Sequence, residues 1–406
     1  MEDTIDYSQY TFRELVEAST TLDSEQYPDR AEQLQSLIAQ HPDNPANQIE
    51  KASDGRKVNV NFHGDGKEFF NIWIVNILLT IVTLGIYSAW ATVRTNRYFY
   101  SNTEVDGRRL YYLADPIKIL KGRVVAVVLF TLVYLLNIFD PLFGLVAMGV
   151  LVFLAPLFIC MSLRFKLRMT AYRNVTFNFS GQYARAFVLF ILLPIASVFT
   201  LYLLFPWVLK KIDEFIYSNA SYGNKPLVTN ISAKEYYLAS LVSAAVGMGL
   251  FFVFAIVSAL VMGGGMAAFG DSADFNESTG ALIFATLGYV FFVVGYVSIV
   301  LTASSLYETW IRNHVYNNTS IQDVCDFHST LSTMDLVLLR LSNFLLIVCT
   351  LGLAVPWTKV RTARFFSQVT SVTILAGADE VIDERGQSSA LGEEVADVFD
   401  FDIGIA

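Results

Sequence analysis

The sequence predicts an all-α polytopic membrane protein with internal repeats and a small cytoplasmic β element. The first observation is composition, because 54% of the 406 residues are apolar and only 16% are charged, which is unusual for a soluble domain. The second is a set of seven apolar stretches, each near the roughly 20 residues that cross a bilayer core. These stretches are residues 70–89, 123–139, 142–160, 187–207, 237–262, 280–303 and 335–357. The third is an element that recurs inside them.

This element occurs twice with identical spacing, and the two copies lie 267 positions apart. The first copy contains Asn76, Thr83, Leu84, Gly85, Trp90, Val93, Arg94, Arg97 and Phe99. The second contains Asn343, Thr350, Leu351, Gly352, Trp357, Val360, Arg361, Arg364 and Phe366. A degenerate third copy follows the first after 117 positions, with Thr200, Leu201, Trp207, Lys211, Tyr217 and Asn219. Such a fixed offset is typical of duplication, so we interpret three copies of one unit, each with a Thr-Leu-Gly segment.

The repeats divide the chain into parts. The predicted parts are, in order, a cytoplasmic helical hairpin at 1–41, a linker at 42–57, membrane repeats at 58–160 and 161–304, a partial repeat at 305–377 and an acidic disordered tail at 378–406. The hairpin is predicted from helically spaced apolar residues on both sides of Pro28. No apolar stretch begins before residue 69, so we expect no cleavable signal peptide.

The tripeptide Tyr-x-Asn recurs after apolar stretches. Its copies are Tyr100 to Asn102, Tyr172 to Asn174, Tyr217 to Asn219 and Tyr316 to Asn318. Alternating or aromatic runs such as VTFNFSG follow these tripeptides, a pattern typical of a turn and a strand or hairpin. The run VNVNFHG predicts one further short strand. We expect these pieces to pair into one small sheet outside the membrane.

The distribution of Lys and Arg predicts the orientation, because basic loops stay in the cytoplasm. Segments 90–123, 161–185 and 208–236 are basic, whereas loops 139–141 and 263–279 carry acids and no base. Seven simple crossings would place two basic segments on opposite sides. We therefore expect the three Thr-Leu-Gly segments to be re-entrant, the four long helices to form two spanning hairpins, and both termini to be cytoplasmic. Seven ordinary spans with a weak charge bias are the alternative.

The distribution of charged residues also predicts which molecules the protein contacts. The net charge of −9 is concentrated in the two acidic tails, so the body between residues 51 and 377 is positive and suits contact with anionic lipid head groups. Nucleic acid is not an expected partner. The three cysteines and four histidines show no metal-ligand or catalytic spacing. We therefore expect no enzymatic activity, no cofactor and no metal.

Aromatic and basic residues share one helix face in each Thr-Leu-Gly copy. They are Trp90, Arg94, Arg97, Trp207, Lys211, Trp357, Arg361 and Arg364. One interpretation is a site for a lipid phosphate or another anionic ligand. The other, which we favour, is anchoring of the helix at the membrane interface, where Trp and Arg are both typical.

Polar residues and helix-breaking residues lie inside the apolar stretches. They are Asn76, Thr83, Gly85, Arg340, Asn343, Thr350 and Gly352. Polar groups at membrane depth are candidates for a transport path. They are also explained by hydrogen bonds between helices or to broken backbone, and Arg340 by a side chain that reaches the interface.

The strings FHGDGKEFFNIWIVNILLTIVTLGIYSAWATVRTNRYFYSNTEVDG and NFLLIVCTLGLAVPWTKVRTARFF resemble the YjgN-like family of Gram-negative inner-membrane proteins. The resemblance covers about residues 58–380. It implies a polytopic inner-membrane protein without an assigned activity, and a membrane zinc metallopeptidase as a partner. The first copy departs from the family's Pro-Trp pattern with Ala89-Trp90, and the middle copy has Tyr202 in place of Gly.

Two functions are compatible with these features. The leading hypothesis is a non-enzymatic envelope protein that scaffolds or regulates a membrane partner, since the anchoring motifs repeat and both tails are charged. The alternative is a channel or transporter for a lipid or small solute, since inverted or repeated units and re-entrant segments are common in transporters.

Overall fold

The computed structural model describes residues 15, 18–19, 31, 34–38, 55–269, 279–379 and 381. Most of the predicted N-terminal hairpin, of the linker and of the acidic tail lies outside these residues, as does the acidic loop after residue 269. Within the hairpin, the helical residues Leu15 and Leu34 are buried against each other.

The central element is a nine-stranded antiparallel sheet with the order β1-β12-β11-β10-β9-β8-β7-β6-β5. Its strands are β1 (Arg56–Asn59), β5 (Tyr111–Tyr112), β6 (Thr170–Tyr172), β7 (Val175–Phe179), β8 (Ala220–Tyr222), β9 (Lys225–Thr229), β10 (Thr319–Ile321), β11 (Cys325–Ser329) and β12 (Thr370–Ile374). A three-stranded sheet joins β2 (Asn61–Phe62), β3 (Thr103–Val105) and β4 (Arg108–Arg109). The prediction of an all-α protein with a small β element is therefore wrong.

The prediction underestimated the sheet because its strands are only two to five residues long. Strands of this length show little alternation, and periodicity is the main sequence signal for a strand. The strand pieces around the Tyr-x-Asn tripeptides were expected to pair. These strands do pair, each with the strand from the next such piece. Examples are the pairing of Phe177 with Tyr222 and of Thr319 with Thr229.

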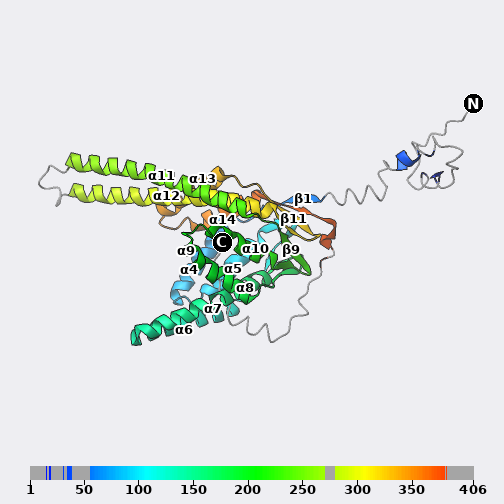
Figure 1. Ribbon diagram of the computed structural model, residues 1–406, viewed down its shortest axis with the longest axis horizontal. Coiled ribbons are helices and arrows are strands. Elements are labelled where there is room, and N and C mark those ends of the chain that lie inside the picture. Colours follow the sequence, from blue (N-terminus) through cyan, green and yellow to red (C-terminus); the bar gives the residue numbers. More distant parts are fainter. Residues whose placement is uncertain are drawn as a thin grey trace, which may run out of the picture.

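Connections between neighbouring strands alternate between tight turns and helical hairpins. The tight turns contain residues with positive φ, as at Asp106 (51°) and Gly107 (69°) or at Arg173 (50°) and Asn174 (65°). Two such residues in succession are typical of the type I′ turn that joins twisted antiparallel strands. The helices between β2 and β12 therefore leave the sheet on the side opposite the tight turns, and Figure 1 shows them on one side of it.

Two helical hairpins are long. They consist of α6 (Pro116–Phe139) with α7 (Pro141–Arg168), and of α11 (Ala233–Phe269) with α12 (Thr279–Asn317). Asp115 and Asp140 cap α6 and α7, and a Pro follows each cap, as is favourable at a helix start. In the described part of the chain, these four helices are long and apolar enough to cross a membrane. The prediction of four long helices is confirmed.

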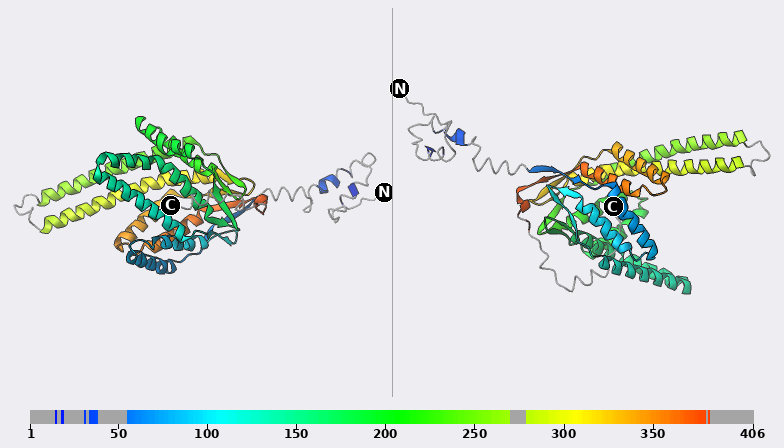
Figure 2. Two further views of the ribbon diagram at one scale, coloured as in Figure 1. Left: turned by 90° about the horizontal axis from the view of Figure 1, so that it is seen from below. Right: turned by 180° about the vertical axis from the view of Figure 1, so that it is seen from behind.

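Three helical hairpins are shorter. The first joins α4 (Gly66–Val82) to α5 (Ser88–Ser101), and the last joins α13 (Thr333–Cys349) to α14 (Val355–Gln368). In the middle hairpin, α8 (Tyr183–Phe187), a π-helical turn η1 (Val188–Leu192) and α9 (Leu193–Phe199) run on without a break and are followed by α10 (Phe205–Ser218). Their 17-residue first arms are about 25 Å long. Figure 2 shows the long hairpins extending beyond them.

The three short hairpins turn with the same backbone geometry, at the Thr-Leu-Gly segments. Pairs of residues with positive φ are Leu84 and Gly85 (50° and 94°), Leu201 and Tyr202 (51° and 62°), and Leu351 and Gly352 (50° and 91°). The second residue of each pair donates its N–H to a carbonyl of the preceding helix, at 2.7 to 2.8 Å. This 6→1 hydrogen bond is the Schellman motif that ends helices.

The threonine before each pair joins the two arms of the hairpin. The Thr83 hydroxyl donates to the Leu79 carbonyl at 2.7 Å and accepts from the Tyr87 N–H at 2.9 Å. Thr350 repeats these contacts at 2.7 Å and 3.0 Å. The leucines that follow are 94%, 85% and 95% exposed at positions 84, 201 and 351. Each short hairpin therefore ends in an apolar tip that the described part of the chain leaves exposed.

We expect opposite stability effects at two equivalent turn positions. A Cβ at Gly352 would meet no atom within 4 Å, so Gly352→Ala acts through the φ of 91° alone and should destabilise by about 1 kcal/mol. Tyr202 holds a φ of 62° with a side chain, and Tyr202→Gly should stabilise by up to about 1 kcal/mol. Thermal unfolding in nanodiscs measures both changes, and a neutral Gly352→Ala would contradict the strain argument.

Candidate functional site

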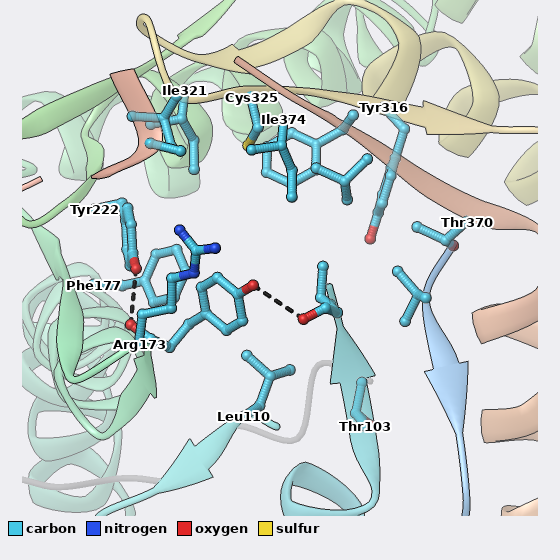
Figure 3. A pocket seen from close by; sticks show the side chains of 17 residues that line it. Thr103, Leu110, Arg173, Phe177, Tyr222, Tyr316, Ile321, Cys325, Thr370 and Ile374 are labelled. Carbon is cyan, nitrogen blue, oxygen red and sulfur yellow. Dashed lines mark hydrogen bonds between the residues drawn. The ribbon is translucent and has the colours of Figure 1, made fainter. Parts of the chain in front are cut away.

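The curved nine-stranded sheet encloses an apolar cavity of about 280 Å³. Alternate residues of β12 face it, because side chains in a strand alternate between the two faces of a sheet. Figure 3 shows Thr370 and Ile374 of this strand on the cavity side, opposite Tyr222 and Leu110. Most of the remaining wall is aliphatic or aromatic, with Val105, Phe177, Ile321, Phe327 and Val372.

The strands of the sheet end on two sides: on one they continue into helices, here called the helical edge, and on the other into tight turns, here called the turn edge. The cavity runs from the helical edge to the turn edge. At the helical edge its wall contains Thr103, Tyr316 and Thr370, which lie within two residues of the ends of α5, α12 and α14. At the turn edge it contains Arg173, in the turn between β6 and β7, and Ala378, just after β12. One end of the cavity therefore faces the side from which the apolar helices leave.

Arg173 is the one charged residue in the described cavity wall. Its Nη2 donates to Asp106 Oδ2 at 3.0 Å, and the other oxygen of Asp106 accepts from Arg56. The Asp106 and Arg173 side chains are 11% and 17% exposed, whereas that of Arg56 is 68% exposed. We call Arg56, Asp106 and Arg173 the arginine cluster. It carries two cations and one carboxylate.

Two tyrosines fix the wall beside the arginine cluster. The Tyr172 hydroxyl donates to the Val105 carbonyl at 3.0 Å, and the Tyr222 hydroxyl donates to the Tyr172 carbonyl at 2.8 Å. Burial raises the pKa of Tyr172, and the nearby Arg173 opposes this rise. The Tyr172 hydroxyl therefore remains a neutral donor near neutral pH. The hydrogen bonds of the two tyrosines hold β3, β6 and β8 together around the cavity.

Cys325 is a buried thiol in the wall, and we expect it to react slowly. Burial raises its pKa from 9.0 to about 12, so its thiolate fraction near pH 8 should be about a thousandfold below that of a free thiol, and should rise tenfold per pH unit. Iodoacetamide alkylation of a Cys160→Ala, Cys349→Ala protein measures the rate. The unfolded protein is the control. A rate like that of an exposed thiol would contradict this burial.

The predicted Trp and Arg positions lie on the short hairpins, outside the cavity wall. Arg97 and Arg364 both donate to backbone carbonyls, of Ala114 at 3.0 Å and of Gly64 at 2.9 Å. Trp357 stacks on Phe70 of α4 with ring centroids 4.9 Å apart. Lys211 lies 5.9 Å from the Trp207 ring centroid, and Arg94 is exposed, with Trp90 partly buried. These contacts favour a structural role.

The predicted polar residues join helices. Asn343 donates to Thr362 at 3.1 Å and accepts from Arg361 at 3.2 Å. Arg340 of α13 pairs with Glu308 of α12 and donates to Ser305 at 3.2 Å. Asn76 donates to the Ala91 carbonyl at 3.4 Å, while its buried Oδ1 finds no hydrogen-bond partner among the described residues. These contacts join α4 to α5, α13 to α14 and α12 to α13.

Three of the four Tyr-x-Asn motifs end helices. Asn102, Asn219 and Asn318 each donate from Nδ2 to the carbonyl four residues before, at 2.7 to 2.8 Å. Asn174 instead occupies the turn between β6 and β7. Of the tyrosines, Tyr172 and Tyr316 line the cavity, and the Tyr100 ring packs against Tyr112. The motif thus supplies part of the candidate site.

Sequence reasoning missed the arginine cluster. Arg56, Asp106 and Arg173 belong to three turns or strands that are far apart in the chain, and only the curl of the sheet brings them together. The signal that was present is Asp106-Gly107 between short alternating runs, which is a strong hairpin pattern. This pattern predicts that Asp106 lies in a turn, but it does not predict which residues contact Asp106.

Residues 57–398 match the family described as a bacterial protein of unknown function, DUF898. The chain belongs to this family. It is 25% identical over 367 residues to the inner membrane protein YjgN of Salmonella typhimurium, a match that covers 80% of this chain and 91% of the relative. It is 38% identical over 125 residues to the protein of the same name in Escherichia coli K12, covering 29% and 30%. No solved structure matches the chain.

The predicted resemblance to the YjgN-like family is confirmed by these matches. The names of the relatives and the four apolar helices agree that this DUF898 member is a membrane protein. Neither the family description nor the relatives' names give an activity, so a proposal about function rests on the cavity and the helices.

Proposed function

We propose that this protein binds and handles lipid at the cytoplasmic face of the bacterial inner membrane. The observation that carries the proposal is the apolar cavity of about 280 Å³ whose helical end faces the membrane side. A pocket with an almost wholly apolar wall suits a hydrocarbon chain, since apolar surface leaves water on binding. The lipid that supplies this hydrocarbon chain would come from the membrane leaflet next to the sheet.

The placement of the sheet follows from its topology and charge. The basic segments 90–123, 161–185 and 208–236 contain or adjoin β3 to β9, so the positive-inside rule favours a cytoplasmic sheet. The relatives are named inner membrane proteins, which supports the inner membrane as the location. Two long hairpins would then span the bilayer.

The three short hairpins act as re-entrant anchors in this proposal. Their first arms of about 25 Å, and their shorter second arms of 14 residues, do not reach across a hydrocarbon core of roughly 30 Å. Both ends of each hairpin return to the sheet. Their shared turn geometry supports an origin by internal duplication. The exposed leucines at positions 84, 201 and 351 would lie in hydrocarbon, and the arginines above them at the head groups, where anionic lipid is the expected contact.

A larger side chain that fills the cavity should abolish binding of the lipid's hydrocarbon chain. Val372 lies in the wall and is 7% exposed, so Val372→Phe should remove most crosslinking of a diazirine-labelled fatty-acyl lipid to β11 and β12. The matched control is Val228→Phe on β9, where the valine is 51% exposed. Mass spectrometry of the crosslinked peptides measures the effect, and thermal unfolding confirms folding. Equal crosslinking of β11 and β12 in both variants would refute the proposal.

A scaffold for a membrane partner is the second candidate, and the long hairpin of α11 and α12 favours it. Within the described residues, none of those in the most apolar windows of these two helices is buried. Near the sheet α11 contacts α10 and α12 contacts α13, but the apolar surface of the hairpin farther along is available to another membrane protein. The resemblance implies a zinc metallopeptidase as that partner, and native mass spectrometry of gently released protein tests for a co-purifying polypeptide.

A further inference from the structure

We propose that Arg94 of the first short hairpin binds the phosphate of an anionic phospholipid, whereas the cations at the corresponding positions of the other two short hairpins are held within the protein. This inference rests on the proposed re-entrant hairpins and adds which of them selects the lipid head group. Its basis is a comparison of Arg94 with Lys211 and Arg361, which lie 117 and 267 positions later in the chain. All three follow a turn of the same backbone geometry.

Partners within their own hairpins hold Lys211 and Arg361. Arg361 of α14 donates from Nη1 to the Ser342 hydroxyl at 2.8 Å and to Asn343 Oδ1 at 3.2 Å, both on α13. Lys211 of α10 donates from Nζ to Glu214 Oε2, one turn farther along the same helix, at 2.9 Å. Both cations are therefore engaged, one by two neutral acceptors and the other by a carboxylate.

The first hairpin lacks both kinds of partner because its sequence differs at two positions. Val75 stands where the last hairpin has Ser342, and Arg97 stands where the middle hairpin has Glu214. Within the described residues, Arg94 makes no hydrogen bond and no ion pair, and its side chain is exposed. Its guanidinium is therefore available to a ligand.

Asn76 shows the consequence of this difference. It corresponds to Asn343, whose Oδ1 accepts from Arg361. Asn76 is only 5% exposed, and its Oδ1 finds no donor among the described residues. A buried acceptor without a donor is unfavourable. The contact that Arg361 makes in the last hairpin is thus open in the first, which favours a partner for Arg94 outside the hairpin.

The position and the chemistry of Arg94 suit a lipid phosphate. Arg94 lies six residues after the start of α5 at Ser88, about 9 Å along the helix axis from the end nearest the tip, and a long arginine side chain reaches from there toward the head groups. A guanidinium group binds phosphate through two parallel hydrogen bonds. An anionic head group is favoured over phosphatidylcholine, whose choline cation lies next to its phosphate. One basic residue near an anionic surface strengthens binding about fivefold.

Crosslinking to lipids with different head groups tests this assignment hairpin by hairpin. Phosphatidylglycerol and phosphatidylcholine, each with a diazirine next to the ester of one acyl chain, are the tracers in phosphatidylcholine nanodiscs. After digestion with chymotrypsin, which does not cleave at arginine, mass spectrometry measures the crosslinked peptides of α5 and α14. We expect about fivefold more crosslinking of α5 with phosphatidylglycerol than with phosphatidylcholine.

Three substitutions separate Arg94 from the charge of the hairpins in general. Arg94→Gln should remove the preference of α5 for phosphatidylglycerol. The matched variant Arg361→Gln removes the same charge at the corresponding position, and should leave any preference of α14 unchanged because Arg361 is already engaged. Val75→Ser returns to the first hairpin the hydroxyl that holds Arg361 in the last, so it should lower the preference of α5 at least twofold without a change in charge. Val75 is partly exposed, so this change does not disturb the core.

The outcomes distinguish this inference from the proposed function. The inference is overturned, with the re-entrant hairpins intact, if α5 crosslinks equally to both lipids, if Arg94→Gln or Val75→Ser leaves its preference unchanged, or if Arg361→Gln acts equally on α14. Loss of the preference on adding inorganic phosphate at constant ionic strength would also overturn it, since a soluble anion would then be the ligand. The proposed hairpins fail too if neither α5 nor α14 crosslinks to either lipid. Failure of the proposed cavity binding would appear instead at β11 and β12.

Discussion

A cysteine at Ser221 will react with a membrane-impermeant maleimide only from the cytoplasm, and a cysteine at Asp140 only from the periplasm. Ser221 lies in β8 and pairs with Asn178 of β7, so the segments before and after the middle short hairpin lie on one side of the membrane. Asp140 lies at the tip of the hairpin of α6 and α7. The expected effect is close to all or none, because the bilayer separates the two positions.

Labelling of intact cells and of inverted vesicles, in a protein without its three native cysteines, measures both positions. A cysteine at Leu84 is the third position, and a re-entrant tip should protect it from the reagent on both sides. Reaction of Ser221→Cys from the periplasm would instead mean that the middle hairpin crosses the bilayer. The sheet and the re-entrant topology would then both be wrong, since β7 and β8 could not pair.

Much of the helical layer could be predicted from the sequence because its signals are long and local. Four apolar runs, two acidic loops and three Thr-Leu-Gly segments each lie within one continuous stretch. The turn itself was predictable, since Gly85 and Gly352 supply the positive φ that it requires. Tyr202 was the departure from the pattern, yet it adopts a φ of 62° and the turn persists, because the surrounding hydrogen bonds determine the backbone.

The sheet and the cavity depend on contacts between distant residues. Arg173 meets Asp106 across 67 positions of sequence, and β1 pairs with β12, so that Val58 lies opposite Val372. No local period encodes such pairs, and hydrophobic alternation in strands of two to five residues is too brief to show which face is concave. Because its strands are short and separated by long helical insertions, the nine-stranded sheet that contains the candidate site is not evident from sequence patterns.

Asp213→Asn will stabilise the protein at pH 8. The carboxyl of Asp213 in α10 is partly buried and accepts from the Tyr236 hydroxyl of α11. Tyr236 has no exposed surface. Burial raises the pKa of Asp213 above its usual 3.8, and the bond from Tyr236 opposes this rise. A raised pKa in the folded state gives stability that is complete below pH 3.8 and is lost as the pH rises through the folded value. Asparagine keeps the acceptor oxygen and cannot ionise.

The gain from Asp213→Asn should therefore shrink as the pH falls, as measured by thermal unfolding in nanodiscs between pH 5 and pH 9. Tyr236→Phe should act in the opposite direction and destabilise by about 1.5–3 kcal/mol at pH 8, because it removes a hydrogen bond to a charged group. The neighbouring Glu214 is the control. Its burial is outweighed by Lys210 and Lys211, at 2.6 Å and 2.9 Å, which lower its pKa.

Glu214→Gln should therefore destabilise at neutral pH, and this loss should disappear in acid as the pH falls through the lowered pKa. Two adjacent carboxylates are thus expected to give opposite pH dependences, one set by burial and the other by ion pairs. If both amide variants shifted stability in the same direction at pH 8, the burial of Asp213 between α10 and α11 would not be the dominant influence on its charge.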